Sequence, residues 1–181
     1  MTSLPLAERL AAVRLLVLDV DGVLTDGIII IDDLGVESKH FHVRDGAAIA
    51  LWNNSGRRTA ILSGRSARCV DLRAAELKIR PVVQGSSAKG EALQAMIAEL
   101  GLEPAEVGFM GDDLADLPAL AVAGFAACPS DAAPEVRAVA HHVAASPGGR
   151  GAVREVIELL LKAQDAWPRA EPAGPRPEPP R

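Results

Sequence analysis

The chain has 181 residues, enough for one sizeable hydrophobic core, and that core must be aliphatic because 49% of the residues are hydrophobic but only 3% are aromatic. A net charge of −5 without a concentrated basic patch argues against nucleic-acid binding. No apolar run approaches transmembrane length and the N-terminus lacks a signal-peptide pattern, so we expect a cytoplasmic protein that does not bind a membrane.

Short apolar segments alternate with amphipathic ones along most of the chain, which predicts βαβ units and a parallel sheet between helices. Predicted strands lie at residues 15–18, 59–62, 81–83, 107–110, 124–128 and 142–144. Predicted helices cover about residues 45–54, 66–77, 89–100, 134–139 and 151–166, and another follows residue 113 and reaches residue 122. We expect an α/β fold with a Rossmann-like three-layer arrangement, made of a lead-in helix at residues 1–13, a main domain at 14–166 and a disordered proline-rich tail at 167–181.

Residues 27–43 have the pattern of a β-hairpin: a β-branched run, the turn residues Asp32-Asp33-Leu34-Gly35, and a second extended run. Four consecutive isoleucines, at residues 28–31, leave apolar groups on both faces of this hairpin. A two-stranded hairpin cannot bury both faces itself, so we expect a partner subunit to cover one of them.

Polar residues follow the predicted strands at their carboxyl ends. They are Asp19, Asp21, Ser63, Lys89 at the start of the next helix, Asp112, Asp113 and Asp116. Because parallel strands place their carboxyl ends at one edge of the sheet, these side chains can converge on one site. Each of them alone has an ordinary structural explanation, such as a turn, a helix cap or a solvated surface residue.

The combined set favours phosphoryl transfer. Carboxylates suit Mg²⁺, which proteins hold by one or two carboxylates together with a substrate phosphate. Lysine and serine supply charge and hydrogen bonds to phosphoryl oxygens, and an aspartate can attack phosphorus to form an aspartyl phosphate. We therefore expect phosphoryl transfer through Asp19.

These residues resemble the four motifs of the haloacid dehalogenase superfamily of phosphatases. The motifs are DVDGVLT at residues 19–25, SGR at 63–65, Lys89, and GDDLAD at 111–116. Within the superfamily, the chain is similar to the phosphatases of 3-deoxy-D-manno-octulosonate 8-phosphate. That narrower resemblance rests on DG at 26–27 with the hairpin, HVRDG at 42–46, QG at 84–85, and GGRGAVRE at 148–155.

The resemblance implies a minimal-cap fold, a Mg²⁺ cofactor and a set of residue roles. Asp19 would be the nucleophile and a metal ligand, and Asp112 a further ligand. Asp21 would act as general acid and base while its backbone carbonyl binds the metal. Ser63 and Lys89 would hold the phosphoryl group. Asp113 or Asp116 would contact the metal ligands and orient them without binding the metal.

The resemblance also implies a homotetramer with the hairpin and the C-terminal segment at subunit interfaces. The substrate would be a sugar-acid phosphate, which the enzyme would hydrolyse to the free sugar acid and phosphate in lipopolysaccharide biosynthesis. Arginine forks suit its carboxylate, so we expect substrate contacts from a group of residues around three arginines. They are His42, Val43, Arg44, Asp45, Gly46, Arg65 and Arg73, with Asp21 and Lys89 on the phosphate side.

Three alternatives stay open at this point. The first is a related phosphatase that acts on another sugar-acid phosphate, such as a nonulosonate 9-phosphate. The second is a phospho-aspartate signalling receiver, which the order of the motifs disfavours because receivers place an adjacent acidic pair at the first strand. The third is an inactive scaffold, which the intact Asp19 and Asp21 disfavour.

Overall fold

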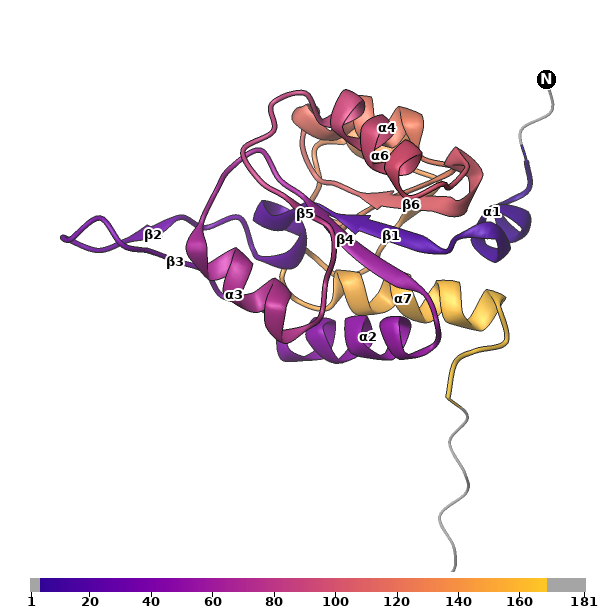
Figure 1. Ribbon diagram of the computed structural model, residues 1–181, viewed down its shortest axis with the longest axis horizontal. Helices are drawn as coiled ribbons and strands as arrows, with labels where there is room; N and C mark the ends of the chain where they lie inside the picture. Colours follow the sequence, from indigo (N-terminus) through magenta and orange to yellow (C-terminus); the bar gives the residue numbers. More distant parts are fainter. Residues whose placement is uncertain (1–3, 169–181) are drawn as a thin grey trace, which may run out of the picture.

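The computed structural model describes residues 4–168, and its centre is a six-stranded sheet in the order β5-β4-β1-β6-β7-β8 (Figure 1). All strand pairs in this sheet are parallel. The strands are β1 (Leu15–Leu18), β4 (Arg58–Leu62), β5 (Val82–Val83), β6 (Val107–Met110), β7 (Phe125–Cys128) and β8 (His142–Val143). The predicted parallel sheet is therefore confirmed.

Helices cover both faces of the sheet. One layer contains α2 (Val43–Asn54) and α7 (Ala152–Ala163), with α1 (Leu6–Ala12) and α3 (Arg68–Glu76) at its edges. The other contains α4 (Lys89–Glu99), α5 (Leu117–Val122) and α6 (Pro134–Val139), and the short turns η2 (Pro104–Glu106) and η3 (Leu114–Asp116) flank it. Figure 1 shows α4 and α6 on the opposite side of the sheet from α2 and α7. None of the helices within residues 4–168 has the length and apolarity needed to cross a membrane.

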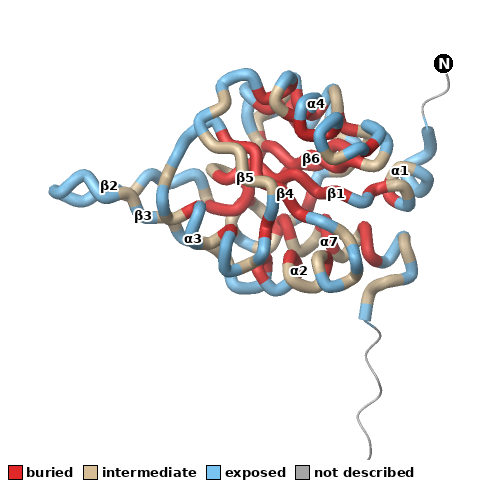
Figure 2. Tube along the Cα trace, in the orientation of Figure 1, coloured by how far each residue is buried: buried red, intermediate tan, exposed pale blue. Residues whose placement is uncertain are grey.

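The central strand β1 is buried on both faces, as its continuous apolar sequence predicts. Leu16 and Leu18 pack in the cluster under α2 and α7, whereas Leu15 and Val17 pack in the cluster under α4 and α5. Figure 2 shows this burial as a continuous buried centre. The β1 backbone is thereby held rigidly from both sides, and so is the residue that follows it, Asp19.

The chain order along the sheet reverses at β1. The connection after β1 leads to β4 on one side, and β6 lies on the other side. In open α/β sheets, ligands bind at the carboxyl ends of the strands where the order reverses. The tip of β1 is thus the place where this fold leaves a crevice.

The turn η1 (Val20–Leu24) follows β1 and is braced by a glycine-rich loop. Gly22 has a φ of +88°, and a Cβ placed on Gly148 would lie 1.8 Å from the Gly22 carbonyl oxygen. The Gly149 N–H donates a hydrogen bond to the Val23 carbonyl at 3.0 Å. This loop, residues 148–151, therefore lies against η1 of its own chain, because only residues without a Cβ can approach that backbone so closely.

The predicted hairpin is present as a two-stranded antiparallel ribbon, which we call the flap (residues 27–43). It contains β2 (Ile30–Ile31) and β3 (Glu37–Ser38), which are shorter than the sequence pattern suggested. Figure 1 shows the flap projecting away from the body of the protein. Ile28, Ile29 and Ile31 are each more than half exposed. The tail predicted for residues 167–181 lies outside the described residues from position 169 onward.

Candidate active site

The polar residues at the strand ends converge on one pocket at the carboxyl edge of the sheet, with a volume of about 540 Å³. Its lining includes every residue that the sequence assigned to the chemistry. They are Asp19, Asp21, Ser63, Lys89, Asp112, Asp113 and Asp116. The topology thus places together groups that are up to 97 residues apart in the chain (116 − 19).

Lys89 is the central cation of this pocket. Its ammonium lies 2.9 Å from Asp19 Oδ2 and 2.5 Å from Asp116 Oδ1, and its side chain is 4% exposed. Burial lowers the pKa of Lys89, but the charges of Asp19 and Asp116 outweigh it and leave the pKa above its ordinary value. Lys89 is therefore a fixed positive charge beside the Asp19 carboxylate.

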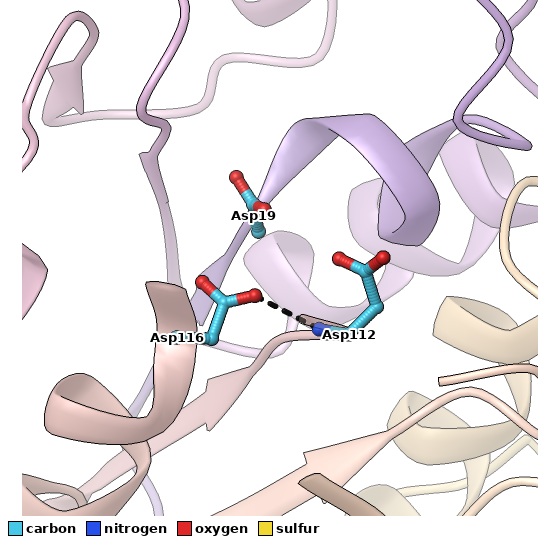
Figure 3. Close-up of side chains that lie close together, drawn as sticks. All are labelled: Asp19, Asp112 and Asp116. Carbon is cyan, nitrogen blue, oxygen red and sulfur yellow. Dashed lines mark hydrogen bonds between the residues drawn. The ribbon is translucent and has the colours of Figure 1, made fainter. Parts of the chain in front are cut away.

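Asp116 uses both of its carboxylate oxygens within the protein. Oδ1 accepts from Lys89, and Oδ2 accepts from the backbone N–H groups of Asp112 at 2.9 Å and Asp113 at 3.2 Å. Figure 3 shows the three carboxylates grouped around a common space, with the hydrogen bond from the Asp112 backbone N–H to Asp116. Asp116 thus orients Lys89 and the loop that carries Asp112.

Three buried carboxylate oxygens in this pocket have no hydrogen-bond partner among the described residues. Two of them, Asp19 Oδ1 and Asp112 Oδ1, belong to the cluster in Figure 3, and the third is Asp21 Oδ2. Ligand atoms of Asp19, Asp112 and Asp116 all lie within 4.8 Å of one another. The absence of a Cβ on Gly22 leaves room for Asp112, since a Cβ there would lie 2.0 Å from Asp112 Oδ2.

Burial and mutual repulsion make these carboxylates costly to ionise. Burial and the Asp116 charge raise the pKa of Asp19 to about 6, although Lys89 opposes the effect. Burial and the charges of Asp116 and Asp19 raise the pKa of Asp112 to about 7. A hard divalent cation satisfies both the unpartnered oxygens and the excess negative charge, so the residues present fit Mg²⁺. Because both carboxylate oxygens of Asp116 already accept hydrogen bonds within the protein, Asp19 and Asp112 are the side chains that suit the metal.

Ser63 follows β4 and is buried with its hydroxyl in the pocket wall. Its Oγ accepts a 3.4 Å hydrogen bond from the backbone N–H of Arg65. Its backbone N–H donates to the carbonyl of Val83 in β5, and its carbonyl accepts from the N–H of Ser86. The hydroxyl hydrogen is free to rotate toward an anion beside Lys89.

Asp21 makes contacts that the sequence did not predict. Its Oδ1 accepts a short hydrogen bond from the ammonium of Lys39, and Lys39 also pairs with Glu37 Oε1 at 2.8 Å. Arg65 approaches Asp21 Oδ2 at 3.6 Å and Glu37 Oε2 at 3.1 Å. Two residues of the flap therefore enter the site. The spacing Glu37-x-Lys39 was the available signal, because residues two apart on a strand share a face.

The residues predicted to contact the substrate divide into three groups. Arg65 lines the acidic pocket together with Asp21 and Lys89. His42, Asp45, Gly46 and Arg73 instead line a separate small cavity under the start of α2. Val43 and Arg44 are exposed on the first turn of that helix.

Two members of that second group have partners of their own. The Asp45 carboxylate is buried and accepts from the N–H groups of Gly151 at 3.1 Å and Arg154 at 2.8 Å, so it caps α7. The Arg73 guanidinium lies against Gly46, where a Cβ would be 2.2 Å from Nη2, and pairs with Glu76 at 2.8 Å. Within this single chain, neither side chain lines the pocket around Asp19.

Comparison with known proteins agrees with these observations. A family model described as haloacid dehalogenase-like hydrolase matches residues 81–157. The chain is 44% identical to 3-deoxy-D-manno-octulosonate 8-phosphate phosphatase of Yersinia pestis over 87% of this chain and 84% of the relative. It is also 44% identical to the enzyme of that name from Escherichia coli strain K12, over 84% of this chain and 81% of the relative.

Solved structures give the same result. The crystal structure of 3-deoxy-D-manno-octulosonate 8-phosphate phosphatase from Moraxella catarrhalis is 42% identical, with a TM-score of 0.86 over 88% of this chain and 91% of that chain. That structure is described as a complex with a magnesium ion, a phosphate ion and the sugar acid. By sequence, fold and site, this chain belongs to the haloacid dehalogenase-like hydrolases, and within them to the family of the 3-deoxy-D-manno-octulosonate 8-phosphate phosphatases.

Proposed function

We propose that this chain is a Mg²⁺-dependent phosphatase that converts 3-deoxy-D-manno-octulosonate 8-phosphate to the free sugar acid and inorganic phosphate. The observation that carries the proposal is the buried Asp19 carboxylate, which has one oxygen 2.9 Å from Lys89 and the other without a partner among the described residues. A carboxylate held in this way at the end of a rigid strand is suited to attack phosphorus. Membership of the family supports the choice of sugar acid.

In the first half of the reaction, the Asp19 carboxylate attacks phosphorus and the bond between phosphorus and the sugar oxygen breaks. Lys89 and Ser63 hold the phosphoryl oxygens, since the transition state needs electrostatic stabilisation. Asp21 donates a proton to the departing sugar oxygen. The products of this half are the free sugar acid and a phosphoryl group on Asp19.

In the second half, Asp21 removes a proton from water, which attacks the phosphorus of the aspartyl phosphate. The bond between phosphorus and Asp19 breaks, phosphate leaves, and the carboxylate is restored. The groups that would hold Mg²⁺ are the carboxylates of Asp19 and Asp112 and the backbone carbonyl of Asp21. The chemistry that Mg²⁺ supplies when bound is neutralisation of the charge on the phosphoryl oxygens and the two carboxylates. Asp113, which caps η3 through Leu114 N–H, would stay outside the ligand set.

The substrate carboxylate needs cations beyond the phosphate site, and Arg65 at the pocket is one. Arg44 and Arg73 lie elsewhere on this chain, so they would serve the site of a neighbouring subunit. The exposed apolar residues of the flap support such an assembly, which we take to be a homotetramer. They are Ile28, Ile29, Ile31, Leu34, Val36 and, at the start of α2, Val43.

The family also supports a cytoplasmic reaction that serves lipopolysaccharide precursor synthesis. A receiver role is not compatible with membership of a hydrolase family. Another sugar-acid phosphate as substrate would use the same catalytic residues and would differ only in the contacts to the sugar.

The test is release of inorganic phosphate, with and without Mg²⁺, from a panel of phosphate esters. The panel contains the octulosonate 8-phosphate, a nonulosonate 9-phosphate and neutral sugar phosphates of similar size. We expect kcat/KM to be highest for the octulosonate ester and to require Mg²⁺. A higher kcat/KM for the nonulosonate ester than for the octulosonate ester would show that the nonulosonate ester is the preferred substrate. A kcat/KM for neutral esters equal to that for the octulosonate ester would refute recognition of the substrate carboxylate.

A further inference from the structure

The flap brings a buried cation to the proposed general acid. The Lys39 side chain is 2% exposed although it lies on a ribbon that projects into solvent, and its ammonium is hydrogen-bonded to Asp21 Oδ1. Asp21 itself is 21% exposed in its side chain. The flap is therefore docked on the active site of its own chain through this pair.

Lys39 belongs to a closed ring of four alternating charges. Asp21 pairs with Lys39, Lys39 with Glu37, Glu37 with Arg65, and Arg65 returns to Asp21. Two members come from the body of the protein and two from β3 and the residue after it. When Asp21 is ionised, the ring contains two positive and two negative groups and is neutral, so it needs no added counterion. When Asp21 carries the proton for the leaving oxygen, Lys39 still donates to Oδ1 and the proton lies on Oδ2.

Lys39 and Arg65 are not equivalent in this ring. The Arg65 side chain is 45% exposed and its Nε is 3.6 Å from Asp21, which is beyond a good hydrogen bond. Lys39 is buried and makes a direct hydrogen bond, and burial strengthens an ionic hydrogen bond because water does not compete for it. Lys39 therefore fixes the direction of the Asp21 carboxylate more strongly than Arg65 does.

We propose that Lys39 is a positioning residue that holds Asp21 for proton transfer to the leaving oxygen. This inference rests on the proposed phosphatase reaction, in which Asp21 serves as general acid. In the absence of Lys39, Arg65 is the one cation among residues 4–168 that still pairs with the Asp21 carboxylate, which then rotates between alternative orientations. Nucleophilic attack by Asp19 does not depend on Lys39, because Asp19 has its own cation in Lys89.

The test uses leaving groups of graded acidity on one aromatic scaffold, so that binding contacts stay constant. A p-nitrophenolate ion departs with little help from an acid, whereas phenolate needs more. The parameter is kcat/KM, since it reports the steps up to departure of the leaving group. A well-placed general acid contributes about 10²- to 10⁴-fold to such a step.

In Lys39→Met we expect kcat/KM for p-nitrophenyl phosphate to fall less than about threefold, and kcat/KM for phenyl phosphate to fall at least about tenfold further. Lys39→Arg, which keeps a cation in reach of Asp21, should restore most of the loss. Asp21→Asn should show the same dependence on leaving group, and adding Lys39→Met to it should cost less than about twofold. Lys162→Met is the matched control, because this lysine pairs with Glu158 on the exposed face of α7.

An equal loss for both aryl phosphates in Lys39→Met would overturn the proposal, because it would show a structural role. So would a loss that adds fully to that of Asp21→Asn, or no loss at all. Lys39→Arg covers the case in which the methionine variant does not fold. If the wild type cleaves aryl phosphates but not the octulosonate ester, the proposed substrate is wrong while the role of Lys39 is still measured.

Discussion

The Asp116 carboxylate accepts a 2.5 Å hydrogen bond from the Lys89 ammonium, and both side chains are almost completely buried. The second Asp116 oxygen accepts two backbone N–H groups of the loop that carries Asp112. One side chain therefore connects the cation proposed to hold the substrate phosphate with the loop proposed to hold the metal.

This connection predicts a large effect of Asp116→Asn. The amide has no negative charge for Lys89 and only one acceptor for three donors. Lys89 keeps Asp19 as a counterion, so the cost comes from the weakened hydrogen bonds to a buried charged group and the unsatisfied donors, and we expect a loss of about 1–3 kcal/mol of unfolding free energy in urea denaturation. The control is Asp113→Asn, because Asp113 is exposed and asparagine is an equally good cap. Equal stability of the two variants would contradict the role of Asp116.

Gly22→Ala should weaken Mg²⁺ binding by obstructing Asp112. The added Cβ would lie 2.0 Å from Asp112 Oδ2, so the carboxylate must move. The matched control is Gly35→Ala, since Gly35 also has a positive φ, of +77°, but has no atom within 4 Å of an added Cβ. Backbone strain is thus similar in the two variants. We expect titration calorimetry with Mg²⁺ to show at least about tenfold weaker binding for Gly22→Ala alone.

The effect of Mg²⁺ on stability should depend on pH. The pKa values of Asp19, about 6, and Asp112, about 7, exceed their ordinary value of 3.8. A raised pKa in the folded state favours folding at low pH. This contribution is fully present below pH 3.8 and is lost progressively as the pH rises from there to about 6 for Asp19 and about 7 for Asp112. The metal-free protein should therefore lose stability over this range, whereas Mg²⁺ binds the ionised carboxylates and restores it.

The measurement is the increase in Tm on adding excess Mg²⁺, recorded at about pH 8 and about pH 5. We expect a clearly larger increase at the higher pH. An increase that is the same at both pH values would mean that these carboxyl groups do not bind the metal. Asp19→Asn and Asp112→Asn should each reduce the difference between the two conditions.

Asp45→Ala should destabilise the protein through α7. The substitution removes the acceptor of two backbone N–H groups at the start of that helix. Loss of a helix cap costs about 0.5–2 kcal/mol, and leaving a second buried donor unsatisfied adds about 1–3 kcal/mol. We expect a lower urea midpoint with an unchanged slope. Asp33→Ala, at the exposed flap turn, is the control and should change the midpoint little.

The parallel sheet and the convergence of the acids were predictable because both follow from local patterns. A buried strand has a continuous apolar sequence, and parallel strands bring their carboxyl ends to one edge. That rule alone places Asp19, Ser63 and Asp112 in one pocket.

The remaining features depend on contacts that no local pattern encodes. Asp45 was predicted to contact the substrate, and no pattern in the sequence indicated that it also caps a helix that starts more than 100 residues later. Lys39 was not singled out because its role depends on the contact between the flap and Asp21 of η1, two segments that the sequence does not pair. The separation of Arg73 from the Asp19 pocket likewise depends on the packing of α3 against α2.

The central claim is that the phosphoryl group passes through Asp19. The most direct test is rapid acid quench of enzyme mixed with octulosonate 8-phosphate labelled with ³²P, followed by peptide mapping. We predict transient label on Asp19, formed and lost at rates compatible with turnover, and no labelled protein with Asp19→Asn. Turnover at the normal rate by Asp19→Asn, or label on a different residue, would contradict the account.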